Sequence, residues 1–204
     1  MLSSLPKRTL ICSPLTRRKV LRVGAFGMLA STPLFAWADE ALAARLREGG
    51  VVLALRHALA PGTFDPPGFR LGDCTTQRNL NDEGRAQAAR LGQWVQARRL
   101  VPARVRSSPW CRCVDTAQGA FGQAEPWDAL SSPASADSAL REQRITGLRA
   151  ALRAVPRGRF EAWVTHQFVL QDLAGVSTAP AEALVLAAGK GASQVDVLAR
   201  ATLY

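Results

Sequence analysis

Two histidines and two arginines, far apart in the sequence, carry side chains that can bind and transfer an anionic group. Arg56 and His57 follow the apolar run 51–55, and His166 follows the apolar run 162–165. Arg112 lies where a third short apolar segment passes into a helical pattern. Guanidinium groups offer fixed charge and paired donors, and a neutral imidazole offers a nucleophilic nitrogen near neutral pH. Together these four side chains suit phosphoryl chemistry.

Any one of these residues has a simpler interpretation. A lone Arg-His pair is more often a solvated arginine beside a hydrogen-bonded loop histidine, and Arg112 alone fits the solvated side of a helix. The chain contains only two histidines, however, and both end a predicted buried strand. Since the carboxyl ends of parallel strands converge on one crevice, we expect one shared site.

Apolar runs alternate with helical patterns along the chain, which predicts the elements that position these residues. Strands are expected at 51–55, 103–108, 162–166 and 183–187, with an edge strand within 193–203. Helices are expected at 40–48, 81–97, from about 110, at 139–155 and at 167–173. The predicted fold class is α/β, a three-layer sandwich with a mostly parallel central sheet flanked by helices.

A long loop, 60–78, separates the first strand from the second helix and is rich in proline and glycine. Loops of this length without regular structure are commonly functional. Its charged residues are expected at the entrance of the site, although the composition also fits plain turn chemistry. These residues are Asp65, Arg70, Asp73 and Arg78.

The first 38 residues have the order of an export signal. A basic region with Arg17-Arg18 precedes the apolar segment 23–35, and Ala36-Trp37-Ala38 provides a signal peptidase site. The arginine pair resembles a twin-arginine signal. We therefore predict a signal peptide at 1–38, a single domain at 39–204 and export to the periplasm. The apolar segment is too short for a stable membrane span, and an uncleaved anchor is the less favoured interpretation.

The positive charge of the chain lies mainly in this segment. Residues 1–38 contain six lysines and arginines and no acidic residue, so the net charge falls from +10 for the whole chain to +4 for 39–204. The high isoelectric point is therefore not a sign of nucleic-acid binding, and no nucleic-acid partner is expected.

Three cysteines remain beyond the predicted signal, at positions 74, 111 and 113. An odd number in an oxidising compartment predicts one disulfide and one buried thiol. Cys74 can pair with Cys111 or with Cys113, and the sequence does not choose. Neither histidine has metal-motif spacing to these cysteines, so no metal site is predicted.

Five short motifs follow one another along the chain: Leu55-Arg56-His57-Ala58, Arg78-x-Leu80, Gly84-Arg85-x-Gln87-Ala88, Ser107-Ser108 through Arg112 to Thr116-Ala117, and Val164-Thr165-His166. In this order they resemble the histidine phosphatase superfamily, the phosphoglycerate-mutase-like proteins. The resemblance runs from Val51 to about Leu186 and includes the compact members, such as phosphohistidine phosphatases and lipopolysaccharide-core heptose phosphatases.

The resemblance implies that His57 is the nucleophile that becomes phosphohistidine. It implies that Arg56, Arg112 and His166 hold the phosphoryl oxygens. Arg78 and Gln167 are expected as further substrate-binding residues, and Gln167 can either donate to a phosphate or narrow the pocket. No metal or organic cofactor is implied. Many members have glycine after each histidine, where this chain has Ala58 and Gln167.

The general acid that protonates a leaving oxygen does not align with a residue of this chain. Asp65, Asp73 and Glu182 are the candidates by loop position, although each fits a loop-capping or solvated carboxylate at least as well. The expected function is a histidine acid phosphatase-type phosphomonoesterase acting on a phosphorylated small molecule, such as a sugar or lipopolysaccharide phosphate. The alternative is a non-catalytic phosphate- or phosphosugar-binding protein on the same fold, and a mutase is disfavoured because family mutases are typically longer and cytoplasmic.

Overall fold

The computed structural model describes residues 34–133 and 136–203, with side chains from Asp39 onward. Most of the predicted signal peptide therefore lies outside the described residues. Helix α1 (Leu34–Glu48) runs through the predicted cleavage point between Ala38 and Asp39, and cleavage there stays a prediction. Within the described ranges, no helix is long and apolar enough to cross a membrane.

A six-stranded sheet forms the centre of the domain, with the strand order β3-β2-β4-β1-β5-β6. The four strands from β3 to β1 are parallel, whereas β5 and β6 are antiparallel to their neighbours. The prediction of a mostly parallel sheet is thus confirmed, because four of the six strands are parallel and these include β1 and β4, which precede the two histidines. The bounds are β1 (Val51–Arg56), β2 (Val105–Ser107), β3 (Glu125–Pro126), β4 (Phe160–Thr165), β5 (Glu182–Ala188) and β6 (Val195–Thr202).

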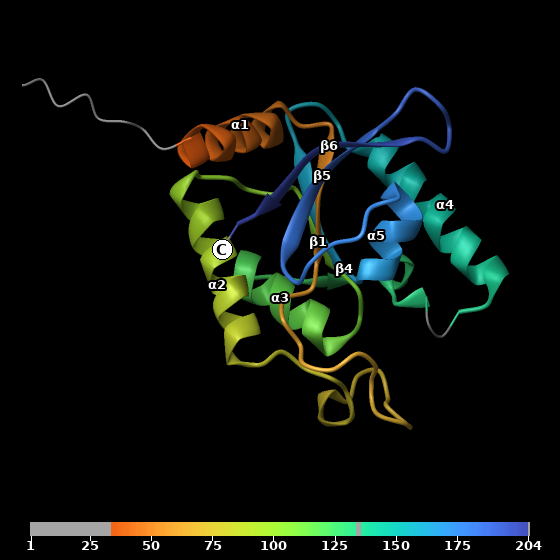
Figure 1. Ribbon diagram of the computed structural model, residues 1–204. Coiled ribbons are helices and arrows are strands. Elements are labelled where there is room, and N and C mark those ends of the chain that lie inside the picture. Colours follow the sequence, from red (N-terminus) through yellow and green to blue (C-terminus); the bar gives the residue numbers. More distant parts are fainter. Residues whose placement is uncertain (1–33, 134–135, 204) are drawn as a thin grey trace, which may run out of the picture. The chain divides into compact units, whose positions relative to one another are not determined.

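Helices cover both faces of the sheet and complete the three predicted layers (Figure 1). Helices α1, α2 (Asp82–Ala97) and α3 (Cys111–Phe121) lie on one face, and α4 (Ser138–Ala154) and α5 (Gln167–Ala174) lie on the other. The sequence did not predict the two-residue strand β3 or the 3₁₀ turns η1 (Cys74–Thr76) and η2 (Asp128–Leu130). These elements are too short to show a periodic pattern.

Strand β1 is buried on both faces, as its continuous apolar sequence predicts. Leu53 and Leu55 pack into the core under α1, α2 and α3, while Val52 and Ala54 pack into the core under α4 and α5. Each large aliphatic side chain buried in this way contributes about 1.5–3 kcal/mol. The strand that ends in Arg56 is therefore anchored from both sides.

The first turn of α2 packs against the chain that follows β1. Asn81 caps the helix by accepting a hydrogen bond from the Gly84 N–H. Gly84 lies so close to this chain that a Cβ atom there would be 2.1 Å from the carbonyl oxygen of Leu59. Glycine at this position allows the helix and the loop after His57 to touch through their backbones.

Candidate functional site

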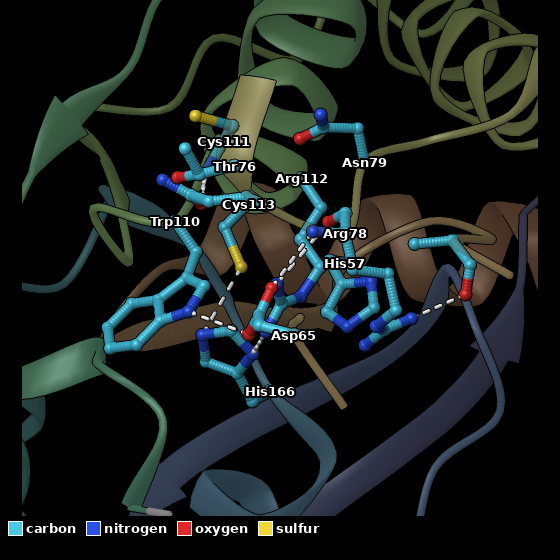
Figure 2. A network of polar contacts seen from close by, with 12 residues as sticks. His57, Asp65, Thr76, Arg78, Asn79, Trp110, Cys111, Arg112, Cys113 and His166 are labelled. Carbon is cyan, nitrogen blue, oxygen red and sulfur yellow. Dashed lines mark hydrogen bonds and ion pairs between the residues drawn. The ribbon is translucent and has the colours of Figure 1, made fainter. Parts of the chain in front are cut away.

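The carboxyl ends of β1, β2 and β4 open onto a cavity of about 320 Å³. Arg56, His57 and His166 directly end or follow two of these strands, and Arg112 lies in the first turn of the helix that follows the third. The structure thus brings together the four residues that the sequence placed at strand ends. Figure 2 shows three of them, His57, Arg112 and His166, from close by. The full lining is Arg56, His57, Gly62, Thr63, Phe64, Asp65, Phe69, Arg78, Trp110, Arg112, Ser132, His166, Gln167 and Phe168.

His57 is buried and held by its ring and by its backbone. Its backbone N–H donates to the carbonyl of Thr165, and its Nδ1 lies 2.8 Å from the carbonyl oxygen of Ala58. Because a carbonyl oxygen only accepts, Nδ1 carries the proton and Nε2 keeps its lone pair. Burial, reinforced by the charges of the nearby arginines, lowers the pKa of His57 to about 3. His57 is therefore a neutral imidazole with an unprotonated Nε2 at neutral pH.

The backbone after His57 is fixed by side chains from two helices. The Ala58 N–H donates to Thr116 Oγ1 on α3 at 3.0 Å, and the Leu59 N–H donates to Gln87 Oε1 on α2 at 2.9 Å. Both acceptors belong to the motifs that carry the family resemblance. They orient the histidine without touching the cavity, which explains their place in those motifs.

His166 lies next to His57, with 5.5 Å between the ring centroids. Its Nδ1 is 3.4 Å from Nη2 of Arg112, which can only donate, so the Nε2 proton is directed to Ser108 Oγ at 2.8 Å. The Sγ of Cys113 lies 3.6 Å from the same Nε2. Burial and the neighbouring His57 and arginines hold the pKa of His166 well below its ordinary value.

Three guanidinium groups supply the positive charge of the cavity. Arg112 is 3 % exposed, and its Nε is buried without a hydrogen-bond partner, as are the Nε atoms of Arg56 and Arg78. Arg56 donates to the carbonyl of Thr178 and Arg78 to that of Ala60. One carboxylate, Asp65, opposes three cations in the lining, so the described part of the cavity is an anion site.

Asp65 is the acid candidate that lines the cavity. It accepts hydrogen bonds from Arg112 Nη1 at 2.8 Å, from Trp110 Nε1 at 3.1 Å and from the Arg78 N–H at 3.0 Å. Burial alone would raise the pKa of Asp65, but these three donors outweigh it and lower the pKa. In this structure Asp65 is an ionised partner of Arg112 rather than a proton donor.

The other two acid candidates lie outside the cavity lining, so their positions do not fit the role that the sequence allowed for them. Asp73 caps η1 and bonds to Thr75 and Arg70, and its pKa is lowered by these contacts. Glu182 pairs with Arg200 and accepts from the Ala179 N–H, and the Arg200 contact lowers its pKa. Both are structural carboxylates.

Gln167 and Arg78, expected as further substrate-binding residues, both line the cavity. The Gln167 amide donates to Ser177 Oγ at 2.9 Å. The sequence did not identify several other residues around the site, because a single thiol or aromatic ring carries no motif of its own. These are Phe64, Phe69, Trp110, Cys113 and Phe168.

The cysteine pairing that the sequence left open is Cys74 with Cys111. This bond joins the loop 60–78 to the first residue of α3, next to Arg112. Cys113 is the buried free thiol, and burial raises its pKa to about 12. Among the described residues no three His, Cys, Asp or Glu side chains are grouped so that they could hold a metal ion.

A protein-family model described as the histidine phosphatase superfamily (branch 1) matches residues 70–183, more than half of the chain. The matched span contains Arg78, Arg112 and His166 and begins after His57. No curated protein sequence matches the chain.

Solved structures share the fold. The product of open reading frame Rv3214 from Mycobacterium tuberculosis has a TM-score of 0.54 at 19% identity, covering 72% of this chain and 96% of that chain. Phosphoserine phosphatase of Entamoeba histolytica in complex with 3-phosphoglyceric acid has a TM-score of 0.51 at 12% identity, covering 74% and 95%. The protein histidine phosphatase SixA complexed with tungstate has a TM-score of 0.50 at 16% identity, covering 74% and 96%.

Proposed function

Because this chain belongs to the histidine phosphatase superfamily, we propose that it hydrolyses phosphomonoesters through a phosphohistidine intermediate on His57. The observation that carries this proposal is the state of His57. Its Nδ1 is committed to the Ala58 carbonyl, and its unprotonated Nε2 belongs to a cavity that three guanidinium groups line. A nucleophile beside fixed positive charge is the arrangement that phosphoryl transfer requires.

The steps follow from these positions. Arg56, Arg112 and Arg78 bind the phosphoryl oxygens and offset the charge that develops during transfer. The lone pair of His57 Nε2 forms the N–P bond as the P–O bond to the leaving group breaks, with the electron pair departing on that oxygen. Water then attacks the phosphohistidine, which releases inorganic phosphate and restores the imidazole.

The proposal also includes the cellular compartment of the enzyme and the class of its substrates. Residues 1–38 act as a twin-arginine signal, so the domain at 39–204 works in the periplasm as a histidine acid phosphatase-type enzyme. Its substrates are phosphorylated small molecules of that compartment, a class that includes sugar and lipopolysaccharide phosphates. The basic signal segment, and not the domain, accounts for most of the positive charge, which supports the absence of a nucleic-acid partner.

The test is to trap the intermediate. The purified domain is mixed with 4-nitrophenyl phosphate and quenched in alkali, where phosphohistidine survives, and the modified peptide is mapped by mass spectrometry. We expect a phosphate on the peptide that contains His57, together with release of 4-nitrophenol. The variant H57N should lose both while keeping its melting temperature within a few degrees. Turnover that survives in H57N would overturn the proposal.

A non-catalytic phosphate-binding protein is the second candidate, and the ion pair between Asp65 and Arg112 favours it. This pair leaves the described cavity lining without an unengaged carboxylic acid to protonate a poor leaving group. Calorimetric binding of inorganic phosphate with neither turnover nor phosphohistidine would support this candidate. Turnover that H57N abolishes would exclude it.

A further inference from the structure

Aromatic side chains form the mouth of the cavity. Six large hydrophobic side chains of the described residues are exposed, and the two aromatic ones, Phe64 and Phe168, both line this cavity. Phe64 is 76% exposed and Phe168 is 54% exposed. Exposure of large apolar rings at a cavity entrance marks a contact surface for a ligand.

Two further aromatic rings lie deeper along the same lining. The ring centroids of Phe69 and Trp110 are 5.9 Å apart, and Trp110 meets the ring of His166 edge-on at 5.3 Å. Aromatic side chains of one cavity lining therefore lie both at the solvent-exposed mouth and beside His166. A flat ring attached to the phosphoryl group would contact these side chains.

The outer lining offers few polar partners for a sugar. Apart from the charged residues and the histidines, the described lining has three polar side chains, Thr63, Ser132 and Gln167. The Gln167 amide already donates to Ser177. Each sugar hydroxyl that is buried without a hydrogen bond weakens binding, so a polyhydroxylated leaving group fits this mouth poorly.

The position of Asp65 restricts the leaving group of the substrate, independently of the aromatic lining. Its carboxylate is ionised and bonded to Arg112, Trp110 and the Arg78 backbone, so it does not supply a proton to the leaving oxygen in this structure. A leaving group must then depart as an anion. A phenol has a pKa of about 10, whereas an alkanol is about as weak an acid as water. Phenolate therefore leaves far more readily than alkoxide.

Within the class of phosphorylated small molecules, we propose that this site prefers aryl phosphates over sugar phosphates, with the ring packed against Phe64 and Phe168 and the phosphoryl group held by the arginines. This proposal rests on the proposed function. In the step, His57 Nε2 forms the N–P bond while the bond between phosphorus and the phenolic oxygen breaks. The electron pair leaves with the phenolate, which takes its proton from water.

Three substrates separate ring recognition from leaving-group quality. Phenyl phosphate has an aromatic ring and a good leaving group, benzyl phosphate has the ring on a poor leaving group, and cyclohexylmethyl phosphate has neither feature. We expect kcat to fall at least 100-fold from phenyl to benzyl phosphate. KM should rise about three- to tenfold from benzyl to cyclohexylmethyl phosphate, as lost aromatic packing predicts.

Glucose 6-phosphate completes the substrate set. Equal kcat/KM for glucose 6-phosphate and phenyl phosphate would overturn the aryl proposal while leaving the proposed function intact. Failure of all four substrates, with no phosphohistidine trapped from 4-nitrophenyl phosphate, would instead overturn the proposed function. The two failures are therefore distinguishable.

Substitutions at the mouth test whether Phe64 and Phe168 contact the ring of the substrate. F64A and F168A should each raise KM for phenyl phosphate about three- to tenfold, with kcat changed less than twofold. V101A and L198A remove similarly exposed apolar side chains outside the cavity lining and should change neither constant. Unchanged KM in both phenylalanine variants would overturn the assignment of the mouth.

Discussion

The two sides of the cavity are built differently. Its floor, which comprises Arg56, His57, Arg112 and His166, is attached to hydrogen-bonded strand ends and to the first turns of α3 and α5. Its wall is the loop 60–78, which has one 3₁₀ turn and no strand pairing within the sheet. His57, Arg112 and His166 are less than 5% exposed, whereas Phe64 in the loop is 76% exposed.

This difference in structure indicates that the floor and the wall have different roles in the reaction. Groups that form and break bonds need fixed geometry, and the packed core supplies it to the floor. The loop is fastened to the floor at a few points, chiefly the contact of Asp65 with Arg112 and the bond of Cys74 to Cys111. We therefore expect changes in the floor to affect kcat and changes in the loop to affect KM.

The largest effect should come from comparing one arginine of the floor with one of the wall. R112A removes a buried guanidinium beside both histidines and should lower kcat/KM for phenyl phosphate about 100- to 1000-fold. R78A removes a half-buried guanidinium of the loop and should lower it about tenfold. Steady-state kinetics on both variants gives the ranking, and equal losses would remove the distinction between floor and wall.

The disulfide should have the next largest effect, because it closes a sequence separation of 37 residues. Chain entropy predicts that C74S loses about 2–4 kcal/mol of unfolding free energy, which lowers the melting temperature by roughly 10 °C. KM should rise more than kcat falls, since the bond fastens the loop. Differential scanning calorimetry and steady-state kinetics measure the two effects.

A reductant provides the control for this prediction. Dithiothreitol should lower the melting temperature of the parent protein and of C113A, because the Cys74–Cys111 bond is present in both. Dithiothreitol should leave the melting temperature of C74S unchanged. A parent protein that is insensitive to full reduction would show that the bond does not fasten the loop.

A smaller effect is expected where wall and floor meet. D65N removes the carboxylate that competes with a phosphoryl anion for Arg112, so inorganic phosphate should bind about three- to tenfold more tightly by calorimetry. D73N is the matched control, because Asp73 is a carboxylate of the same loop outside the cavity lining, and its Kd should not change. An unchanged Kd in D65N would mean that the pair does not compete with phosphate.

The last and smallest effect concerns the protonation of His57, which should not change near neutral pH. Since burial lowers the pKa of His57 to about 3, its ring nitrogens should show no titration between pH 5 and 8. The chain has two histidines, so ¹⁵N NMR assigns both. A midpoint near 6.5 for His57 would contradict the buried, neutral state.

The same pKa shift makes stability depend on pH. Between pH 6.5 and about 3 the unfolded chain takes up a proton on His57 that the folded chain does not. The free energy of unfolding should therefore decrease as the pH falls through this range. Urea denaturation should show a shallower decrease for H57N, and an identical slope would show that His57 is not the group responsible.

The floor was predictable from the sequence because each of its residues sits at the end of a periodic segment. The apolar runs before His57 and His166 predict buried strands, and the topology of a parallel sheet then brings their ends together. The four parallel strands of the sheet and the helices on both faces were predicted for the same reason. The antiparallel pairing of β5 follows no comparable signal in its apolar sequence.

The wall could not be predicted because its contacts are long-range and irregular. The sequence placed Asp65 near the entrance, but not its bonds to Arg112 and Trp110, which are 47 and 45 residues away. Cys111 and Cys113 were equivalent candidates in the sequence. In the structure Cys111, the first residue of α3, is the partner of Cys74. The mouth was missed because single phenylalanines in a loop and on a helix are usually core residues.

Gly84 has a consequence for how sequences of this fold can vary. Any larger residue would drive its Cβ into the Leu59 carbonyl, two residues beyond His57, and would push α2 and the loop apart. Variation at this surface helix is therefore limited by its packing against the chain that follows His57. A library of substitutions selected only for folding should tolerate changes along the outer face of α2 and still reject nearly all of them at this one glycine.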